Sequence, residues 1–586
     1  MIHRSFLLRL SLLVFIVTHL FMSQAALAKR EIREPEAATG FNQKKAVFSN
    51  QYMVVAANPY ASKAGLAMLD KGGSAVDAAI AAQLVLSLVE PQSSGLGGGT
   101  FMLHWHNKKQ ELTTFDGRET APQNATSELF LDDNGKPLRW SEAVVGGKSV
   151  GVPGLLAALD KAHKQFGVLP WQVLFQPAIT LAEDGFIVSQ RLEKLLGMNF
   201  NPGIHLLPEI KNYFSPNGTG IKAGDTLKNP KLAKALKSIA KDGVEVFYQG
   251  WIAKKIVEKV QQSVISPGLL SLDDMKNYQA IERASVCGPY HQFKVCGMAP
   301  PSSGGISVIQ ILAQLQSFEL AQYPPNSLHA IHLLTQSSRL AFADRNKYIA
   351  DSDFVSVPVK GLIAKDYLAK RAALINEKRD MGKAKAGKPE KSLELANDNA
   401  IERPSTTHLV VVDKQGNAIS MTSSIENGFG SALMVQGFIL NNQLTDFSLA
   451  PKRNGNWVAN RVEPLKRPRS SMAPMMVFNE DNSLRLILGA PGGSRIINYV
   501  AQTIIGVLDW QLNVQQAINL PKVTNRNYVT TLELDTDVAK LKPALEARGH
   551  TVKVRALNSG LHAIEVTKTG LVGGADPRRE GVVLGR

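Results

Sequence analysis

The fold is decided by the stretch TTHLVVVDKQGNAISMTSS, which covers residues 406–424. Two apolar runs flank a polar turn, and Lys414-Gln415-Gly416 fits a three-residue hairpin loop with its glycine in the left-handed conformation. Counting outward from this loop places Thr406 opposite Ser424, to within the one residue that a bulge would add. Hydroxyl pairs across strands are common, so this segment by itself also fits an ordinary β-hairpin.

The residues just before the hairpin differ from everything around them. Residues 381–405, MGKAKAGKPEKSLELANDNAIERPS, are charged, interrupted by Gly and Pro, and almost without aromatic or β-branched side chains. This composition predicts an exposed, flexible connector. A connector that ends abruptly at a strand indicates a processing point where the strand begins.

The remaining chain mixes helical and strand patterns. Helix-like apolar spacing runs from Gln51 to about Glu90, residues 141–265 are mainly helical, and a mixed β segment follows to about Met298. A helix-rich stretch then continues to about Arg379. No repeat occurs at solenoid or propeller periods. The mixture permits an α+β fold.

Composition fits a globular protein and argues against a nucleic-acid partner. The 586 residues are 44% apolar and 20% charged, enough for a full core. The net charge of +16 could indicate nucleic-acid binding. The lysines and arginines are spread along the chain, however, and no RNA-binding or helix-turn-helix signature occurs. We therefore interpret the charge as a basic surface.

The N-terminus predicts export. Arg4 and Arg9 precede an apolar run over 10–22, and Ala26-Leu27-Ala28 supplies the small-x-small pattern of a cleavage site. A membrane anchor is the alternative, but the run is shorter than the ~20 residues of a span. We expect residues 1–28 to be a signal peptide, no stable membrane span after its removal, and a periplasmic or secreted protein.

The only two cysteines, Cys287 and Cys296, lie in VCGPYHQFKVC. Strand-like residues on both sides of a turn make a disulfide across a hairpin possible, and export to an oxidising compartment favours it. Two packed thiols are the alternative. The spacing is not that of a zinc site.

Seven segments of unusual composition occur in order from about residue 50 to the C-terminus. They are SSGLGGGTF (93–101), DGRETAP (116–122), PPSSGGIS (300–307), TTHLVVVDKQGNAISMTSS (406–424), LNNQLTDFS (440–448), KRPRSSMAP (466–474) and GAPGGSRII (489–497). Together they resemble the γ-glutamyltranspeptidases, which are N-terminal nucleophile (Ntn) hydrolases. The resemblance implies a four-layer αββα sandwich built from two chains of one cleaved precursor.

The resemblance also implies how the chain matures. The hydroxyl of Thr406 would attack the carbonyl carbon of Ser405, and hydrolysis of the ester would give a large chain, 29–405, and a small chain, 406–586. The new amino group, with a pKa near 8, would serve as general base for the Thr406 nucleophile. Ser424 matches the family position whose hydroxyl bonds the nucleophile. Spacing alone does not exclude Thr407.

The remaining site residues follow from the same resemblance. Those expected to hold the α-carboxylate of a γ-glutamyl donor are Arg118, Ser470 and Ser471, and a guanidinium can do so with two parallel bonds. Asp446, with Gln443 beside it, would receive the α-ammonium. Gly492 and Gly493 would form the oxyanion hole, since two backbone N–H groups can converge where no β-carbon blocks them.

Two departures from the family pattern affect specificity. Position 426, commonly asparagine, is Glu426, a carboxylate that could also receive the ammonium. The alternative interpretation is that Glu426 is a solvent-facing residue of a loop. Residues 449–464 correspond to a loop that lids the site in some members, and Trp457 is their only aromatic side chain.

These features predict an exported γ-glutamyltransferase and glutathione hydrolase. It would transfer γ-glutamyl groups to water, amino acids or peptides through a threonine ester, with no metal and no organic cofactor. One rival is a glutaryl or cephalosporin acylase, whose donor lacks the α-ammonium. The other is a non-catalytic exported binding protein that retains the fold.

Overall fold

The computed structural model describes residues 38 and 40–586, apart from 199, 401 and 404. The signal peptide expected at 1–28 lies outside these residues. Within the described part of the chain, no helix is both long and apolar enough to cross a membrane.

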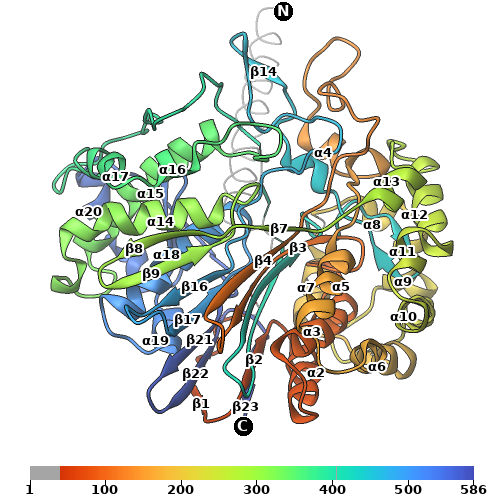
Figure 1. Ribbon diagram of the computed structural model, residues 1–586. Helices are drawn as coiled ribbons and strands as arrows, with labels where there is room; N and C mark the ends of the chain where they lie inside the picture. The colour runs from red at the N-terminus through yellow and green to blue at the C-terminus, as the bar shows by residue number, and fades with distance from the viewer. Residues whose placement is uncertain (1–37, 39, 199, 401, 404) are drawn as a thin grey trace, which may run out of the picture.

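Two seven-stranded antiparallel sheets form the centre of the molecule (Figure 1). The first contains, in spatial order, β1 (Val47–Ser49), β22 (Gly570–Ala575), β21 (His562–Thr567), β17 (Leu484–Gly489), β16 (Met475–Phe478), β9 (Phe293–Gly297) and β8 (Val286–Tyr290). The second contains β23 (Val582–Gly585), β2 (Met53–Ala56), β10 (Thr407–Val412), β11 (Ala418–Ser424), β3 (Gly99–His106), β4 (Glu111–Gly117) and β7 (Ile281–Arg283).

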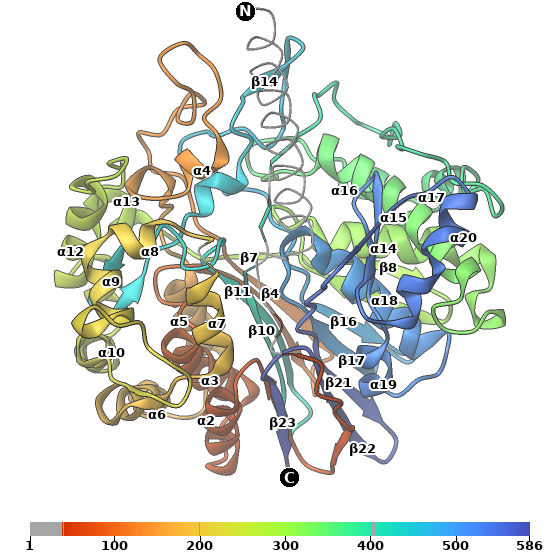
Figure 2. The ribbon, with the colours of Figure 1, turned by 180° about the vertical axis from the view of Figure 1, so that it is seen from behind.

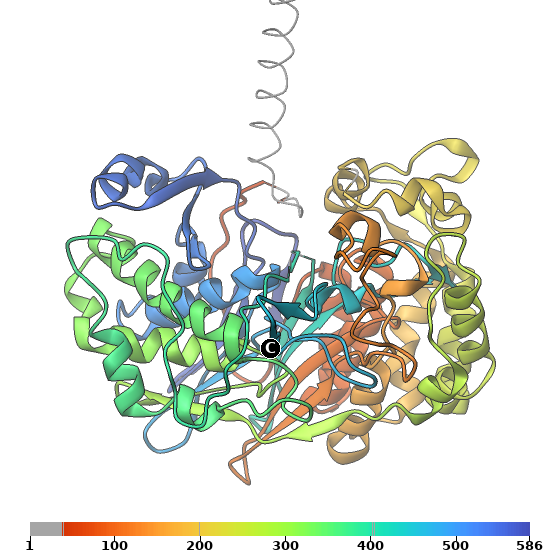
Figure 3. The ribbon, with the colours of Figure 1, turned by 90° about the horizontal axis from the view of Figure 1, so that it is seen from above.

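Helices cover the outer faces of both sheets, as the views from behind and above show (Figures 2 and 3). Those sharing a core with the second sheet include α2 (Pro59–Asp70), α3 (Ala75–Val89), α5 (Leu155–Phe166), α6 (Trp171–Asp184), α7 (Gln190–Gly197), α10 (Pro230–Asp242) and α12 (Trp251–Gln261). Those packed with the first are α14 (Gly304–Leu315), α15 (Leu328–Tyr348), α18 (Ile496–Leu508) and α19 (Val514–Asn519). The predicted four-layer αββα sandwich is confirmed.

Smaller elements lie at the periphery. The short helices are α4 (Trp140–Ala143), α8 (Gly203–Leu206), α9 (Pro208–Phe214), α11 (Glu245–Tyr248), α13 (Leu272–Asn277), α16 (Val359–Leu362), α17 (Lys365–Ala372) and α20 (Lys542–Ala547). A three-stranded sheet contains β18 (Val523–Asn525), β19 (Val529–Glu533) and β20 (Thr551–Arg555). The two-stranded pairs are β5 (Phe186–Ile187) with β6 (Thr226–Leu227), β12 (Met434–Val435) with β13 (Phe438–Ile439), and β14 (Lys452–Arg453) with β15 (Asn456–Trp457).

Strand β10 lies inside the second sheet, between β2 and β11, and all its residues are buried. Leu409 and Val411 belong to the core between the second sheet and the helices that cover it. Val410 and Val412 belong to the other core, which lies between the two sheets and extends to the helices over the first sheet. Side chains alternate between the two faces of a strand. Because both faces of β10 are covered, its sequence is a continuous apolar run rather than an alternation.

The hairpin register agrees with the one counted from its loop. Thr407 pairs with Ser423, so Thr406 lies opposite Ser424. The backbone N–H of Asp413 donates to the carbonyl of Asn417 at 2.9 Å. Gly416 has φ +78°, the left-handed conformation that the loop requires.

Each sheet combines strands from both sides of the Ser405–Thr406 bond. In the second sheet, β2, β3, β4 and β7 precede the bond, while β10, β11 and β23 follow it. In the first, β1, β8 and β9 precede it and the other four strands follow. The segments before and after this bond therefore share both sheets and both cores.

The connector contains no helix or strand in its described residues, but the prediction that it is exposed is wrong for its C-terminal end. Asp398, Glu402 and Ser405 are all buried. The reason is electrostatic: Asp398 and Glu402 pair with the buried guanidinium groups of Arg469 and Arg345. Composition showed that the segment is charged but not that its acids neutralise cations inside the protein.

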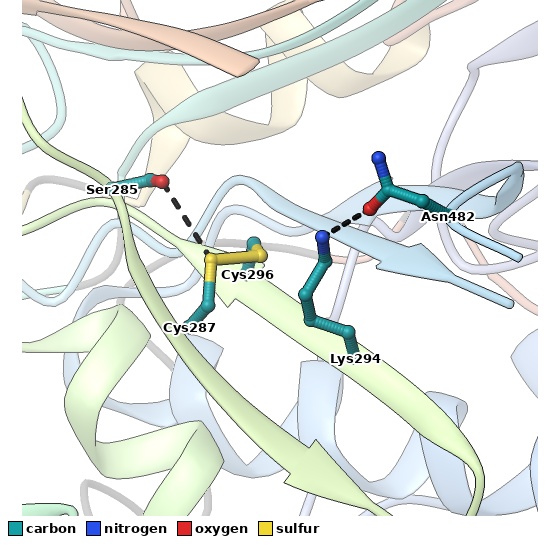
Figure 4. The surroundings of a disulfide bond; sticks show 5 residues. All are labelled: Ser285, Cys287, Lys294, Cys296 and Asn482. Atoms are coloured by element: carbon teal, nitrogen blue, oxygen red, sulfur yellow. Dashed lines mark hydrogen bonds between the residues drawn. A yellow bond between two sulfur atoms is a disulfide. The ribbon is translucent and has the colours of Figure 1, made fainter. Parts of the chain in front are cut away.

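Cys287 and Cys296 form a disulfide with an S–S distance of 2.07 Å (Figure 4). The two residues lie directly opposite each other on β8 and β9. Nearby, the ammonium of Lys294 donates to the side chain of Asn482, in the turn between β16 and β17. The disulfide and this hydrogen bond both fasten β9 to its neighbours at the edge of the first sheet.

Candidate active site

Thr406 lies at the start of β10, where the chain is continuous with Ser405. The Thr406 hydroxyl donates to the Ser405 carbonyl oxygen. The Ser424 hydroxyl donates to the same oxygen at 3.0 Å, and the two hydroxyl oxygens are 3.3 Å apart. Two donors on one carbonyl draw electron density towards its oxygen and make its carbon more electrophilic. The arrangement favours attack on the peptide bond that precedes Thr406.

The neighbouring hydroxyls have different roles. Ser405 Oγ donates to the carbonyl of Gln92 at 2.7 Å and anchors the end of the connector. Thr407 lies opposite Ser423, and its Oγ1 is buried without a hydrogen-bond partner among the described residues. Thr407 does not line the pocket that contains Thr406. The geometry therefore separates the two threonines that spacing alone could not.

Glu426 is buried in the pocket of Thr406 and Ser424 and does not face the solvent. Its backbone N–H donates to Ser424 Oγ at 2.9 Å, and its carboxylate accepts from the side chain of Asn442 and the backbone N–H of Arg403. The side chain is 3% exposed. Glu426 therefore orients Ser424 with its backbone and presents a carboxylate to the same pocket.

Glu426 and Asp446 both line the pocket, as expected for two groups facing one ammonium. Burial, followed by the proximity of Asp446, raises the pKa of Glu426 well above its ordinary value. Burial also raises the pKa of Asp446 to about 6, although Arg118 opposes the increase. Gln443 Nε2 donates to Asp446 Oδ2 at 2.7 Å. A cation between the two carboxylates would relieve both their repulsion and their desolvation.

Arg118 is fully engaged by protein groups in this uncut chain. Its Nη2 donates to Asp446 and to the carbonyl of Arg469, and its Nε donates to the carbonyl of Pro468. Its Nη1 lies 3.7 Å from Glu119. In the uncut chain the guanidinium of Arg118 thus neutralises Asp446, the acid that is expected from the sequence to receive a substrate ammonium.

Ser471 holds a carboxylate that belongs to the connector. Glu402 accepts from the Ser471 hydroxyl and pairs with Arg345, while Arg345 also donates to Ser471 Oγ at 2.7 Å. Burial alone would raise the pKa of Glu402, but Arg345 and Arg469 hold it well below its ordinary value. Glu402 therefore occupies, as an anion, the place where the sequence predicts a substrate carboxylate.

Ser470 and Gly493 complete the pocket wall. Ser470 accepts from the backbone N–H of Met472 at 3.1 Å, and its own carbonyl accepts from Ser303. Gly492 and Gly493 both have positive φ, at +132° and +57°. Gly493 lines the pocket, whereas Gly492 is not part of its lining.

The pocket has almost no free space in the uncut chain. Its volume is about 20 Å³, room for about one water molecule. Glu402, Arg403 and Ser405 form part of its wall. While the end of the connector holds this position, the pocket has no room for a group much larger than a water molecule.

The residues predicted from the sequence that line this pocket are Arg118, Ser405, Thr406, Ser424, Glu426, Gln443, Asp446, Ser470, Ser471 and Gly493. Sequence reasoning missed Glu402, Arg345 and Asn442. It also missed Glu119, whose carboxylate oxygens are buried without a hydrogen-bond partner among the described residues. For two of these residues the sequence held a clue. Glu119 directly follows Arg118, and Glu402 lies just before the expected cleavage point at Thr406.

The expected lid region folds as a hairpin above the connector. Strands β14 and β15 pair within it, and the Trp457 ring is 44% exposed with Lys452 and Arg461 against its faces. The carbonyl of Trp457 accepts from the N–H of Ala396 in the connector. The hairpin thus contacts the connector at Ala396, and Trp457 does not line the pocket of Thr406.

Comparison with known proteins agrees with this geometry. The gamma-glutamyltranspeptidase family model matches residues 61–586. The glutathione hydrolase proenzyme of Bacillus subtilis (strain 168) is 38% identical over 546 residues, or 91% of each chain. That of Escherichia coli (strain K12) is 36% identical over 597 aligned positions, covering 99% of this chain and 98% of the other. The cephalosporin acylase from Bacillus halodurans superposes with a TM-score of 0.82 at 26% identity, covering 94% of this chain and 99% of that chain.

The relatives are all named as enzymes, which argues against a non-catalytic binding protein that retains the fold. The fold alone is common to the acylase and to the glutathione hydrolases, whereas the family model and the more similar relatives specify γ-glutamyl chemistry. The relatives are also named as proenzymes, which are precursors that become active on cleavage. This chain belongs to the γ-glutamyltranspeptidase family and is an Ntn hydrolase with a threonine nucleophile.

Proposed function

We propose that the precursor cuts itself between Ser405 and Thr406, giving chains 29–405 and 406–586 that remain together. The Thr406 Oγ attacks the Ser405 carbonyl carbon, the C–N bond breaks, and the hydroxyl proton moves to the departing nitrogen. Water then hydrolyses the ester to a Ser405 carboxylate and a free Thr406 amine and hydroxyl. The observation that carries this proposal is the Ser405 carbonyl oxygen held by two hydroxyls.

The mature enzyme would use the same hydroxyl on a γ-glutamyl donor. The free amine of Thr406 takes the proton from its own Oγ as the donor carbonyl is attacked, and gives it to the leaving amine. Gly492 and Gly493 stabilise the oxyanion, and Ser424 holds the nucleophile. Water or an amine acceptor then breaks the γ-glutamyl–Thr406 ester.

Recognition of the donor rests on the charged groups around Thr406. Arg118, Ser470 and Ser471 bind its α-carboxylate, which takes the place that Glu402 holds in the precursor. Asp446, Gln443 and Glu426 receive its α-ammonium. A glutaryl or cephalosporin side chain without this ammonium would leave two buried carboxylates facing each other, which disfavours the acylase alternative.

Glutathione is the proposed donor, and water, amino acids or peptides are the proposed acceptors. The N-terminal 28 residues direct export to the periplasm or beyond. Glutathione turnover by the purified mature protein tests this function directly. Release of glutamate and cysteinylglycine is the expected result, and cleavage of glutaryl amides without cleavage of glutathione would refute the proposal.

A further inference from the structure

The end of the connector is held by its side chains. Among the described residues from Asn399 to Ser405, no backbone-to-backbone hydrogen bond joins one residue to another or to the rest of the described chain. The carboxylate of Glu402 and the hydroxyl of Ser405 anchor this stretch on either side of Arg403. The position of the carbonyl that Thr406 attacks therefore depends on side-chain contacts made just before it.

Arg403, two positions before Ser405, contacts the protein in two ways. Its backbone N–H donates to Glu426 Oε1 at 3.2 Å. Its guanidinium lies over the ring of Trp140, 4.6 Å from the ring centroid, and its Nε is buried without a hydrogen-bond partner among the described residues. An aromatic face attracts a cation electrostatically, and the attraction grows as water is removed. The ring of Trp140 is thus a platform on which this cation rests.

The platform is built by parts of the chain other than the connector. Trp140 is the first residue of α4, half-buried, and packs against the core between the second sheet and its helices. Shortly after α4, the backbone N–H of Gly146 donates to the carbonyl of Ser431 at 3.0 Å. Ser431 lies in the same loop between β11 and β12 as Glu426. The ring and the carboxylate that hold Arg403 are therefore fastened to each other independently of the connector.

The same contacts lead to the carbonyl that is attacked. Glu426 accepts from Arg403 with its carboxylate, and its own backbone N–H donates to Ser424 Oγ at 2.9 Å. Ser424 Oγ in turn donates to the Ser405 carbonyl oxygen at 3.0 Å. Without the Trp140 contact, Arg403 and the chain leading to Ser405 could take other positions. A misplacement of about 1 Å between reacting groups can slow a reaction by on the order of a hundredfold.

We infer that Trp140 is a positioning residue for self-cleavage and that it acts through Arg403. This inference rests on the proposed cut between Ser405 and Thr406. Trp140 does not line the pocket of Thr406. Its ring keeps the Arg403 side chain in place, and Arg403 keeps the Ser405 carbonyl within reach of the Thr406 hydroxyl.

The rate of self-cleavage tests the inference. Newly made precursor can be labelled in a pulse of cell-free translation, and its conversion into two chains followed by electrophoresis. Trp140→Leu keeps an apolar side chain but removes the aromatic face, and it should slow the cut by about tenfold. Trp140→Phe restores an aromatic face and should recover most of the rate. A role in apolar packing alone would not separate these two variants in this way.

Matched variants locate the effect at Arg403. Trp457→Leu removes another ring that lies under cations but does not line the pocket, and it should cut at the wild-type rate. Arg403→Ala should slow the cut as much as Trp140→Leu, and the double variant should be no slower, because both changes remove one contact. Lys388→Ala removes an exposed cation from the same connector and should have no effect.

The outcomes separate this inference from the function on which it rests. A wild-type rate for Trp140→Leu, or equal rates for Trp140→Leu and Trp140→Phe, would overturn the inference alone. Additive losses in the double variant would show that the ring acts without Arg403 and would also overturn it. Thermal unfolding in the Thr406→Ala background shows whether each variant folds. If Trp140→Leu does not fold, a wild-type rate for Arg403→Ala overturns the inference. A wild-type chain that stays uncut would overturn the proposed function and the inference together.

Discussion

The pocket of Thr406 and a second cavity meet at Glu402 but leave very different amounts of space. The pocket is nearly filled, and the ion pairs Arg118–Asp446 and Arg345–Glu402 neutralise charge at its wall. The second cavity, lined by residues of the connector, of α15 and of the sheet β18–β20, is about twenty times larger. The uncut chain therefore leaves almost no room around Thr406, while a much larger space adjoins it.

The largest effect is expected from Thr406→Ala. Without the hydroxyl no N→O shift can occur, so the chain should remain a single uncut polypeptide with no γ-glutamyl activity. Electrophoresis and N-terminal sequencing check this. In the wild type the smaller chain should begin Thr406-Thr407-His408, and any other start would remove Thr406 as nucleophile.

Arg118→Lys should weaken binding of the donor without preventing self-cleavage. The substitution keeps the charge but loses the two-pronged donor, which costs on the order of 1.5–3 kcal/mol, or roughly ten- to a hundredfold in kcat/KM on glutathione. Self-cleavage should continue. Unchanged kinetics on glutathione would place Arg118 outside the donor site.

Glu426→Gln should act on donors that carry an α-ammonium. Removing one of two carboxylates weakens the attraction for that cation, so kcat/KM for a γ-glutamyl amide should fall by roughly tenfold, a cost of one charge-assisted bond. The matching glutaryl amide should change little. An equal loss on both donors, or no loss on either, would separate Glu426 from ammonium recognition.

The smallest effect concerns the stability of the uncut protein. Burial, opposed by Arg118, raises the pKa of Glu119 to about 8 from the 4.5 of the free side chain. Between these values the folded chain holds a proton that the unfolded chain releases, so the stability contribution of Glu119 falls as pH rises.

Glu119→Gln removes this decline. In the Thr406→Ala background we expect it to raise stability at pH 8 relative to pH 5 by on the order of 2 kcal/mol. Thermal unfolding at the two pH values measures it, with Glu480→Gln, which alters an exposed side chain, as control. A difference between the two pH values that matches the control would mean that Glu119 is ionised in the folded protein throughout.

The sequence predicted those features that depend on local pattern or on shared family motifs. The register of the hairpin followed from its loop, because turn geometry fixes which residues face each other. The neutralisation of Arg345 by Glu402 could not be predicted in this way. It depends on two buried charges 57 positions apart, and the composition of the connector suggested solvation instead.

The interleaved sheets determine how the two halves behave after the cut. With strands from both halves in each sheet, separation would require the hydrogen bonds of five strand pairings, β2–β23, β2–β10, β3–β11, β1–β22 and β9–β16, to break together. The cut would therefore change the chemistry at one end of β10 without creating a dissociable complex. Activity of the mature enzyme should be independent of dilution, and its loss on heating should follow first-order kinetics. Separately produced halves should fail to assemble when mixed, because neither can complete a sheet or a core alone.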